Sequence, residues 1–331
     1  MITWNSSRRS IWTNSFVVLA LLVVPQAARA QWRATVGAQS WDSARQALAF
    51  FPNELWIHAG DDVTWTSEAG EIHTVTFLAT SPAAQVRPPF QVGCPGFSGE
   101  PVSFDGTACV STSPLVKGAS FKVAFPTPGN FKIVCLVHPD MTGVVHVLAP
   151  ATPLPHNQSF YDAEAAAQAQ ALLSDVDDNA YQEDGDVTTP GHVIAGKGET
   201  SSNQAGFLSL SVVRFIGGNM LIHAGQTIEW GNEDPQTPHT ITFGVEPANP
   251  IPPSANVTID PDGARHATLN SPADHVHSGF IAPAPQERIG LPQSPLGVNR
   301  FRVTFSHAGV FPYICVLHDD LGMKGTITVL P

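Results

Sequence analysis

The chain has 331 residues, enough for about two domains of ordinary size, and 43% of them are hydrophobic. Charged residues make up 13%, whereas 29 Pro and 27 Gly favour short strands joined by many turns. The net charge is −12, from 16 basic and 28 acidic residues. Because nucleic-acid binding needs Lys and Arg to displace counterions, this charge argues against nucleic acid as a partner and favours a basic protein.

Residues 1–30 have the pattern of a signal peptide. Two arginines, Arg8 and Arg9, precede the apolar run Phe16–Val24, and Ala28-Arg29-Ala30 supplies the small residues that signal peptidases cut after. The run is far shorter than the roughly 20 residues that cross a bilayer, so we expect no membrane span in the mature chain. Removal of this segment leaves 13 basic and 28 acidic residues, a net charge of −15. The expected location is the periplasm or the cell exterior.

The remaining chain repeats itself. Leu55–Trp65 returns 165 residues later as Met220–Trp230, and Phe121–Cys135 returns as Phe301–Cys315. Both copies alternate apolar and polar residues and are punctuated by glycine, which is typical of half-buried antiparallel strands. The sequence therefore predicts an all-β protein made of two tandem β-sandwiches.

The predicted domains cover residues 31–150 and 189–331, with a linker over 151–188. Within the linker, the Ala-rich stretch Tyr161–Ser174 favours a short helix, and the acidic stretch Asp175–Asp186 a flexible tether. The Pro-rich segment Val245–Pro295 is expected to form long loops on the second domain.

The four cysteines fall into two classes. Cys135 and Cys315 occupy matching positions in the two copies, whereas Cys94 and Cys109 lie in a Gly/Pro-rich loop of the first copy alone. Since an exported protein meets an oxidising compartment, Cys94 and Cys109 are predicted to form a disulfide.

Residues suited to a metal site are also duplicated. Cys135, His138 and Met141 share one short loop, while His73 comes from a strand far upstream. In the second copy the corresponding residues are His239, Cys315, His318 and Met323. Two His, one Cys and one weak Met suit copper in both oxidation states, whereas zinc rarely accepts Met. Each copy is therefore predicted to bind one copper ion.

These loops resemble those of the cupredoxin family of blue, type 1 copper proteins, the first loop being similar to amicyanin and the second to plastocyanin or pseudoazurin. The resemblance implies two cupredoxin-like Greek-key sandwiches joined by a short helical linker. It also implies that His138 and His318 reach toward the surface, where electrons enter. Plastocyanins usually carry Asn after the upstream His, where this chain has Thr74 and Thr240. Their hydroxyl groups are candidates to hold the loop beside the thiolate.

The favoured function is single-electron transfer with a redox partner, such as a basic cytochrome. One alternative is copper storage or delivery. Another is a two-domain copper oxidase or nitrite reductase, which needs further histidines around a second copper, typically one directly before the ligand Cys. Here Val134 and Ile314 hold that position, and Leu78 stands where nitrite reductases carry another ligand. The chain is therefore expected not to be an enzyme.

Other histidines receive no metal role. His275-Val276-His277 has no counterpart in the first copy and is expected to be a solvated loop. His58 and His223 lie beside Ala-Gly turns and are expected to be structural or exposed.

Overall fold

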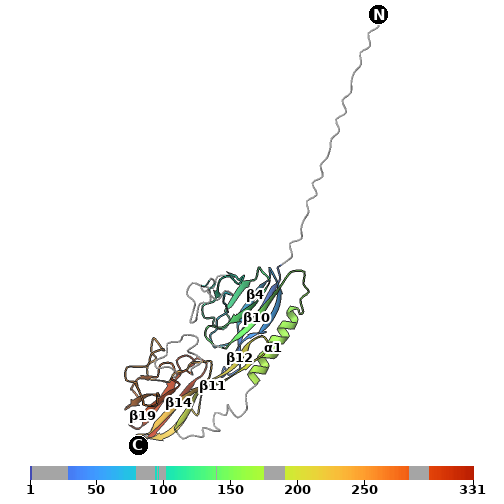
Figure 1. Cartoon of the computed structure of the whole chain (residues 1–331). Coiled ribbons are helices and arrows are strands. Elements are labelled where there is room, and N and C mark those ends of the chain that lie inside the picture. Colours follow the sequence, from blue (N-terminus) through green and yellow to red (C-terminus); the bar gives the residue numbers. More distant parts are fainter. Residues whose placement is uncertain are drawn as a thin grey trace.

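The computed structural model describes Met1 and residues 29–79, 94, 96, 102–138, 140–174, 191–282 and 298–331 (Figure 1). The predicted signal peptide, except for Met1, Arg29 and Ala30, and the predicted tether after Ser174 lie outside these residues. Within the described part of the chain, no helix combines the length and apolar character needed to cross a membrane.

The N-terminal half is a sandwich of two sheets, with strand orders β2-β1-β4-β8-β6 and β3-β10-β9-β5-β7. Its strands are β1 (Gln31–Gln39), β2 (Arg45–Phe51), β3 (Glu54–His58), β4 (Asp62–Ser67), β5 (Thr76–Phe77), β6 (Val102–Ser103), β7 (Val110–Ser111), β8 (Ser120–Ala124), β9 (Gly129–Val134) and β10 (Thr142–Leu148). Strands such as β8 bury every second side chain, as the alternation in the sequence predicts.

The C-terminal half repeats this plan, with orders β16-β17-β19-β14-β11-β12 and β13-β21-β20-β15-β18. Its strands are β11 (His192–Ser202), β12 (Phe207–Ile216), β13 (Asn219–His223), β14 (Thr227–Glu233), β15 (Thr242–Phe243), β16 (Thr258–Ile259), β17 (Arg265–Leu269), β18 (Val276–His277), β19 (Arg300–Phe305), β20 (Gly309–Ile314) and β21 (Lys324–Leu330). The prediction of loops for the Pro-rich segment was incomplete, because β16, β17 and β18 lie within it.

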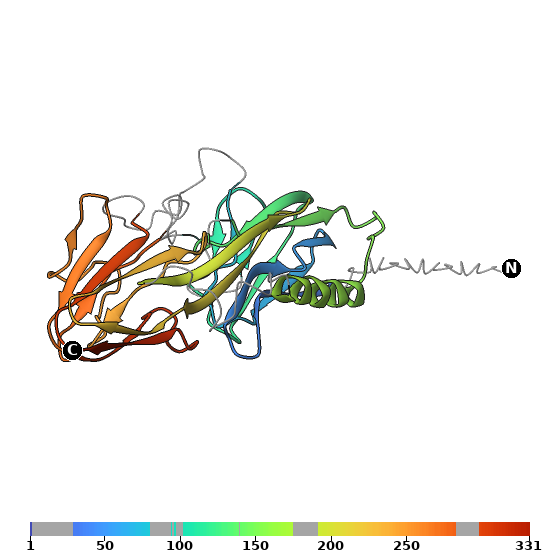
Figure 2. The ribbon, with the colours of Figure 1, turned by 90° about the horizontal axis from the view of Figure 1, so that it is seen from below.

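The two halves share one continuous sheet of 11 strands. Strand β2 of the first half pairs antiparallel with β12 of the second, and Gln46 and Ser211 are register partners in this pairing. The two strands hold equivalent places in the repeat, so the joint pairs one edge with its own copy in the manner of a two-fold interface. Figure 2 shows β11 and β12 extending from the C-terminal half toward the N-terminal half.

Helix α1 (Gln158–Ser174) confirms the predicted linker helix. Asn157 caps it, because its Oδ1 accepts the N–H of Phe160 at 3.0 Å. Leu172 near its end is buried in a cluster with Phe51 of β2 and Leu208 of β12. The helix therefore covers the joint between the halves.

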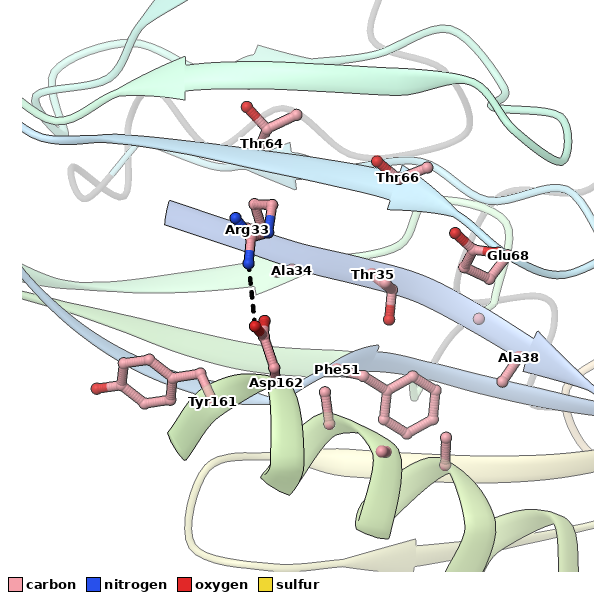
Figure 3. Close-up of a pocket in the computed structure, with 14 residues that line it drawn as sticks. Arg33, Ala34, Thr35, Ala38, Phe51, Thr64, Thr66, Glu68, Tyr161 and Asp162 are labelled. Atoms are coloured by element: carbon pink, nitrogen blue, oxygen red, sulfur yellow. Dashed lines mark hydrogen bonds and ion pairs between the residues drawn. The ribbon is translucent and has the colours of Figure 1, made fainter. Parts of the chain in front are cut away.

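A groove runs between α1 and the strands β1 and β4 (Figure 3). The ion pair between Arg33 and Asp162, at 3.0 Å, crosses it, and both side chains are largely exposed. Gly37 is among the residues that line this groove.

Each core is organised around a tryptophan at the equivalent position of the repeat. Trp65 and Trp230 are both fully buried. Their rings pack on Phe77 and Phe243, with centroids 5.6 and 5.8 Å apart respectively. Since these phenylalanines lie four residues after His73 and His239, the aromatic packing fixes the segments that carry the two upstream histidines.

Candidate metal centres

The first group consists of His73, Cys135 and His138; each offers one ligand atom, and these three atoms lie within 4.8 Å of one another. Cys135 and His138 follow the end of β9, and His73 lies in the segment between β4 and β5. Sγ of Cys135 is 3.6 Å from Nδ1 of His138. All three side chains are buried, and among the residues that the structure describes neither ring nitrogen of His73 has a hydrogen-bond partner. A buried imidazole without a protein partner is costly unless it binds something else.

The second group, His239, Cys315 and His318, has the same construction. Sγ of Cys315 is 3.3 Å from Nδ1 of His318 and 4.0 Å from Nδ1 of His239, and the two Nδ1 atoms are 3.1 Å apart. One thiolate and two imidazole nitrogens thus converge on a common point.

Both predicted methionines lie beside their cysteines. Met141 and Met323 are fully buried in the same core clusters as Cys135 and Cys315. The N–H of Cys135 donates to the carbonyl oxygen of Met141 at 3.0 Å, and that of Cys315 to Met323 at 3.1 Å. These hydrogen bonds close each loop and hold the Met next to the Cys in space as well as in sequence.

The two threonines hold the thiolate loops. The N–H of Thr74 donates to Sγ of Cys135 at 3.4 Å, and that of Thr240 donates to Sγ of Cys315 at 3.3 Å. The Thr74 and Thr240 hydroxyl oxygens accept the N–H of the residue after each Cys, at 2.7 and 2.9 Å. In the first group alone, the N–H of Val137 also donates to the sulfur, at 3.4 Å.

Two glycines that the sequence analysis did not select make room for the upstream histidines. Gly37 in β1 and Gly196 in β11 have φ of +67° and +80°, and each lies at a register shift of its strand. A Cβ at Gly37 would lie 2.5 Å from Nε2 of His73, and one at Gly196 only 1.9 Å from Nε2 of His239. A glycine interrupting a strand is the signal that indicates such a bulge or close approach.

The charge state of the cysteines suits metal binding. Burial raises the pKa of Cys135, but the nearby imidazoles of His138 and His73 outweigh it, so the pKa lies well below the ordinary value of a thiol. Burial also raises the pKa of Cys315. The charge of His318 and the hydrogen bonds from both imidazoles outweigh burial, so this pKa too lies well below the ordinary value. A thiolate is the form of Cys that binds metals.

The pKa values of the two upstream histidines, His73 and His239, shift in opposite directions. Burial lowers the pKa of His73, whereas the Cys135 sulfur and the Glu71 carboxylate outweigh burial and raise the pKa of His138 to about 9. At His239, burial is outweighed by the Asp234 carboxylate and the Cys315 sulfur, so its pKa is raised.

The expectation that His138 and His318 reach the surface was wrong. Both are buried, and both point Nε2 at the carboxylate of Glu71, at 3.5 and 2.9 Å. Glu71 belongs to the N-terminal half, so its contact with His318 crosses the joint between the halves, whereas its contact with His138 lies within one half. Sequence patterns within a single copy carry no signal for the contact across the joint.

The predicted disulfide between Cys94 and Cys109 is present, with Cα atoms 5.4 Å apart. It belongs to the first half alone and takes no part in either group. Cys135 and Cys315 are the free, buried cysteines.

Three other histidines, His277, His58 and His223, are hydrogen-bonded within the protein. His277 lies in β18 and is buried, with Nδ1 2.7 Å from the Thr242 hydroxyl and Nε2 2.9 Å from the carbonyl oxygen of Pro250. The expectation of a solvated loop was therefore wrong for His277. His58 and His223 contact the carbonyl oxygens of Thr152 and Pro331, as structural residues do.

No sequence-family model and no curated protein matches the chain. Among solved structures, a reduced amicyanin variant is similar over 36% of this chain and 82% of its own, with 19% identity and a TM-score of 0.24. A purple cupredoxin from Nitrosopumilus maritimus is similar over 35% of this chain and 99% of its own, with 21% identity and a TM-score of 0.24. Plastocyanin from Dryopteris crassirhizoma covers 42% of this chain and 99% of its own, with 18% identity and a TM-score of 0.23.

The donor set fits copper. Sulfur and imidazole nitrogen are the ligands of blue copper sites, and both groups are buried in the sandwich cores. In its ligand-loop motifs, its all-β sandwich architecture and its two His-Cys-His groups, the chain resembles two cupredoxin domains joined in tandem.

Proposed function

We propose that the protein is an exported carrier of single electrons that binds one type 1 copper ion in each half. His73, Cys135, His138 and Met141 hold one ion, and His239, Cys315, His318 and Met323 hold the other. The observation that carries the proposal is the convergence, in both halves, of one cysteine Sγ and two imidazoles on a point sealed from solvent.

Bound copper would supply a reversible change between its cuprous and cupric states. The chain's contribution is to hold the ligands in one arrangement. The sandwich core fixes His73 and His239, the backbone hydrogen bonds to Met141 and Met323 close the loops, and the threonine contacts orient the sulfur atoms. Because so little of this framework is free to move, little rearrangement accompanies the gain or loss of an electron.

Burial of both groups favours a carrier over storage or delivery, since a delivery protein must expose its metal to an acceptor. Among the described residues, the groups of His, Cys, Asp and Glu that lie close enough to hold a metal are these two. An oxidase or nitrite reductase would need a further copper with an open position for its substrate. A non-blue copper signal in addition to the two blue ones would therefore identify an enzyme.

We assign residues 1–30 to a signal peptide, 31–150 and 189–331 to two copper domains, and 151–188 to their linker. The protein then acts in the periplasm or outside the cell. The net charge of −15 after residue 30 supports a basic redox partner, such as a cytochrome, that is attracted at long range.

Metal analysis and electron paramagnetic resonance of the purified, oxidised protein test the proposal. We expect two copper ions per chain, both with the spectrum of a blue site. Cys135→Ser and Cys315→Ser should each remove about half of the intense thiolate-to-copper absorption, since each deletes one of two thiolate ligands. A colourless protein after copper reconstitution, or an undiminished colour in either variant, would contradict it.

A further inference from the structure

One buried carboxylate lies between the two candidate metal centres. Oε1 of Glu71 is 3.5 Å from Nε2 of His138, and Oε2 is 2.9 Å from Nε2 of His318. The side chains of Glu71, His138 and His318 are 7%, 0% and 2% exposed. Since Nδ1 of each loop histidine faces its cysteine, the other edge of each ring faces the same carboxylate.

The joint between the halves fixes Glu71 in this place. Gln46 on β2 is buried at the centre of the pairing with β12, and its Oε1 accepts the N–H of Glu71 at 3.1 Å. Its register partner Ser211 donates a hydrogen bond to Asp234 in the corresponding segment of the other half. The paired strands thus anchor both segments that face the opposite ligand loop.

The contact across the joint is made in both directions. Gln236 lies 165 residues after Glu71, the spacing of the repeat, and reaches the first ligand loop. Its Oε1 accepts the N–H of Asp140 at 3.0 Å, and its Nε2 donates to the Asp140 carboxylate at 3.1 Å. Each half therefore sends one side chain to the other half's loop, but Glu71 alone of this pair contacts the imidazoles.

We propose that Glu71 couples the two copper centres, so that an electron passes between them inside one molecule through His138, Glu71 and His318. The inference rests on the proposed function and deepens it. In this step one electron leaves the reduced centre and enters the oxidised one, so no bond breaks, no proton moves and no further reactant is needed. Both loop imidazoles are buried, so they face Glu71 and, beyond it, each other rather than an outside partner.

The first test measures how far apart the centres are. With metal–imidazole bonds of about 2 Å and the two contacts to Glu71, the ions lie at most about 17 Å apart. Pulsed electron paramagnetic resonance on the oxidised, copper-loaded protein reads this distance from the dipolar coupling of the two ions. A distance clearly beyond this limit overturns the proposal.

The second test changes the bridge. Brief partial reduction of the copper-loaded protein should be followed by a redistribution of the electron whose rate is independent of protein concentration. We expect Glu71→Leu to slow this phase several-fold and Glu71→Gln, which keeps the shape and one contact, to slow it less. Asn203→Ala is the matched control, because the hydrogen bonds that its side chain makes go across the joint to Asn53 and to its own turn, and none of them goes to a copper ligand. An unchanged rate in Glu71→Leu overturns the proposal.

A third measurement needs no metal. In the copper-free protein, nuclear magnetic resonance should detect an imidazole N–H of His318 that the Glu71 contact protects from exchange, and Glu71→Gln should weaken that protection. Equal exchange in both proteins overturns the proposed contact. A protein that binds no copper overturns the proposed function and this inference together. If the protein binds two blue copper ions but Glu71→Leu leaves the rate of electron redistribution unchanged, the inference alone is overturned. Should Glu71→Leu not fold, the distance and Glu71→Gln decide.

Discussion

Replacing Gly196 with alanine tests whether the bulge in β11 exists to admit the histidine of the second centre. The new Cβ would lie 1.9 Å from Nε2, 2.4 Å from Cδ2 and 2.7 Å from Cε1 of His239, so the whole outer edge of the ring stands in its way. The backbone there has φ of +80°, which costs alanine about 1–2 kcal/mol. Displacing a packed ring adds about 1–3 kcal/mol. We therefore expect Gly196→Ala to lower the free energy of unfolding by about 2–5 kcal/mol.

Gly225→Ala provides the matched control. Gly225 also has positive φ, +89°, but a Cβ there has no neighbour within 4 Å. It should cost about 1–2 kcal/mol, the backbone term alone. Urea unfolding of the copper-free proteins measures both values, and the gain from restricting the unfolded chain cancels between them. After copper loading, Gly196→Ala should also alter the paramagnetic resonance spectrum of one centre. Equal losses of stability with identical spectra would refute the steric explanation.

Three further predictions concern the whole molecule. The Cys135 sulfur accepts a second N–H, from Val137, and this hydrogen bond stabilises the electron-rich reduced centre. A redox titration should therefore give two midpoint potentials, the higher one belonging to the centre of the first half. A single midpoint or the reverse order would contradict this. Replacing Cys94 and Cys109 together by alanine should lower stability by at most about 3 kcal/mol for a loop of 15 residues, and a changed blue absorption would show that the loop supports the centre. Stopped-flow reduction by a basic cytochrome should slow as salt is added, and a rate indifferent to salt would exclude electrostatic attraction.

The ligand sets could be predicted because their signal is local and duplicated. Cys-x-x-His followed by Met occupies a single loop, and the repeat aligns each remote histidine with its counterpart. The linker helix followed from composition in the same way. Gly37 and Gly196 were within reach of the same reasoning, because a glycine that interrupts an alternating strand indicates a close approach.

The role of Glu71 and the burial of the loop histidines could not be predicted from the sequence. Both depend on the pairing of β2 with β12, whose partners Gln46 and Ser211 lie far apart in the sequence. Nothing in either strand distinguishes an edge that pairs within its own half from one that pairs with the other. The strands of the Pro-rich segment were missed for a related reason: β16 and β17 form only a short hairpin, and β17 also pairs in parallel with the distant strand β19.

The same joint has a consequence for what either half would be alone. Severed from its partner, each half would present a long strand, β2 or β12, with a full row of unsatisfied amide and carbonyl groups. Such edges recruit other chains, and long exposed ones promote aggregation. In the intact chain they protect each other, and the outermost strands of the shared 11-stranded sheet, β6 and β16, are only two residues long. Expressed separately, the halves should self-associate, whereas in the tandem chain each half covers the exposed edge strand of the other.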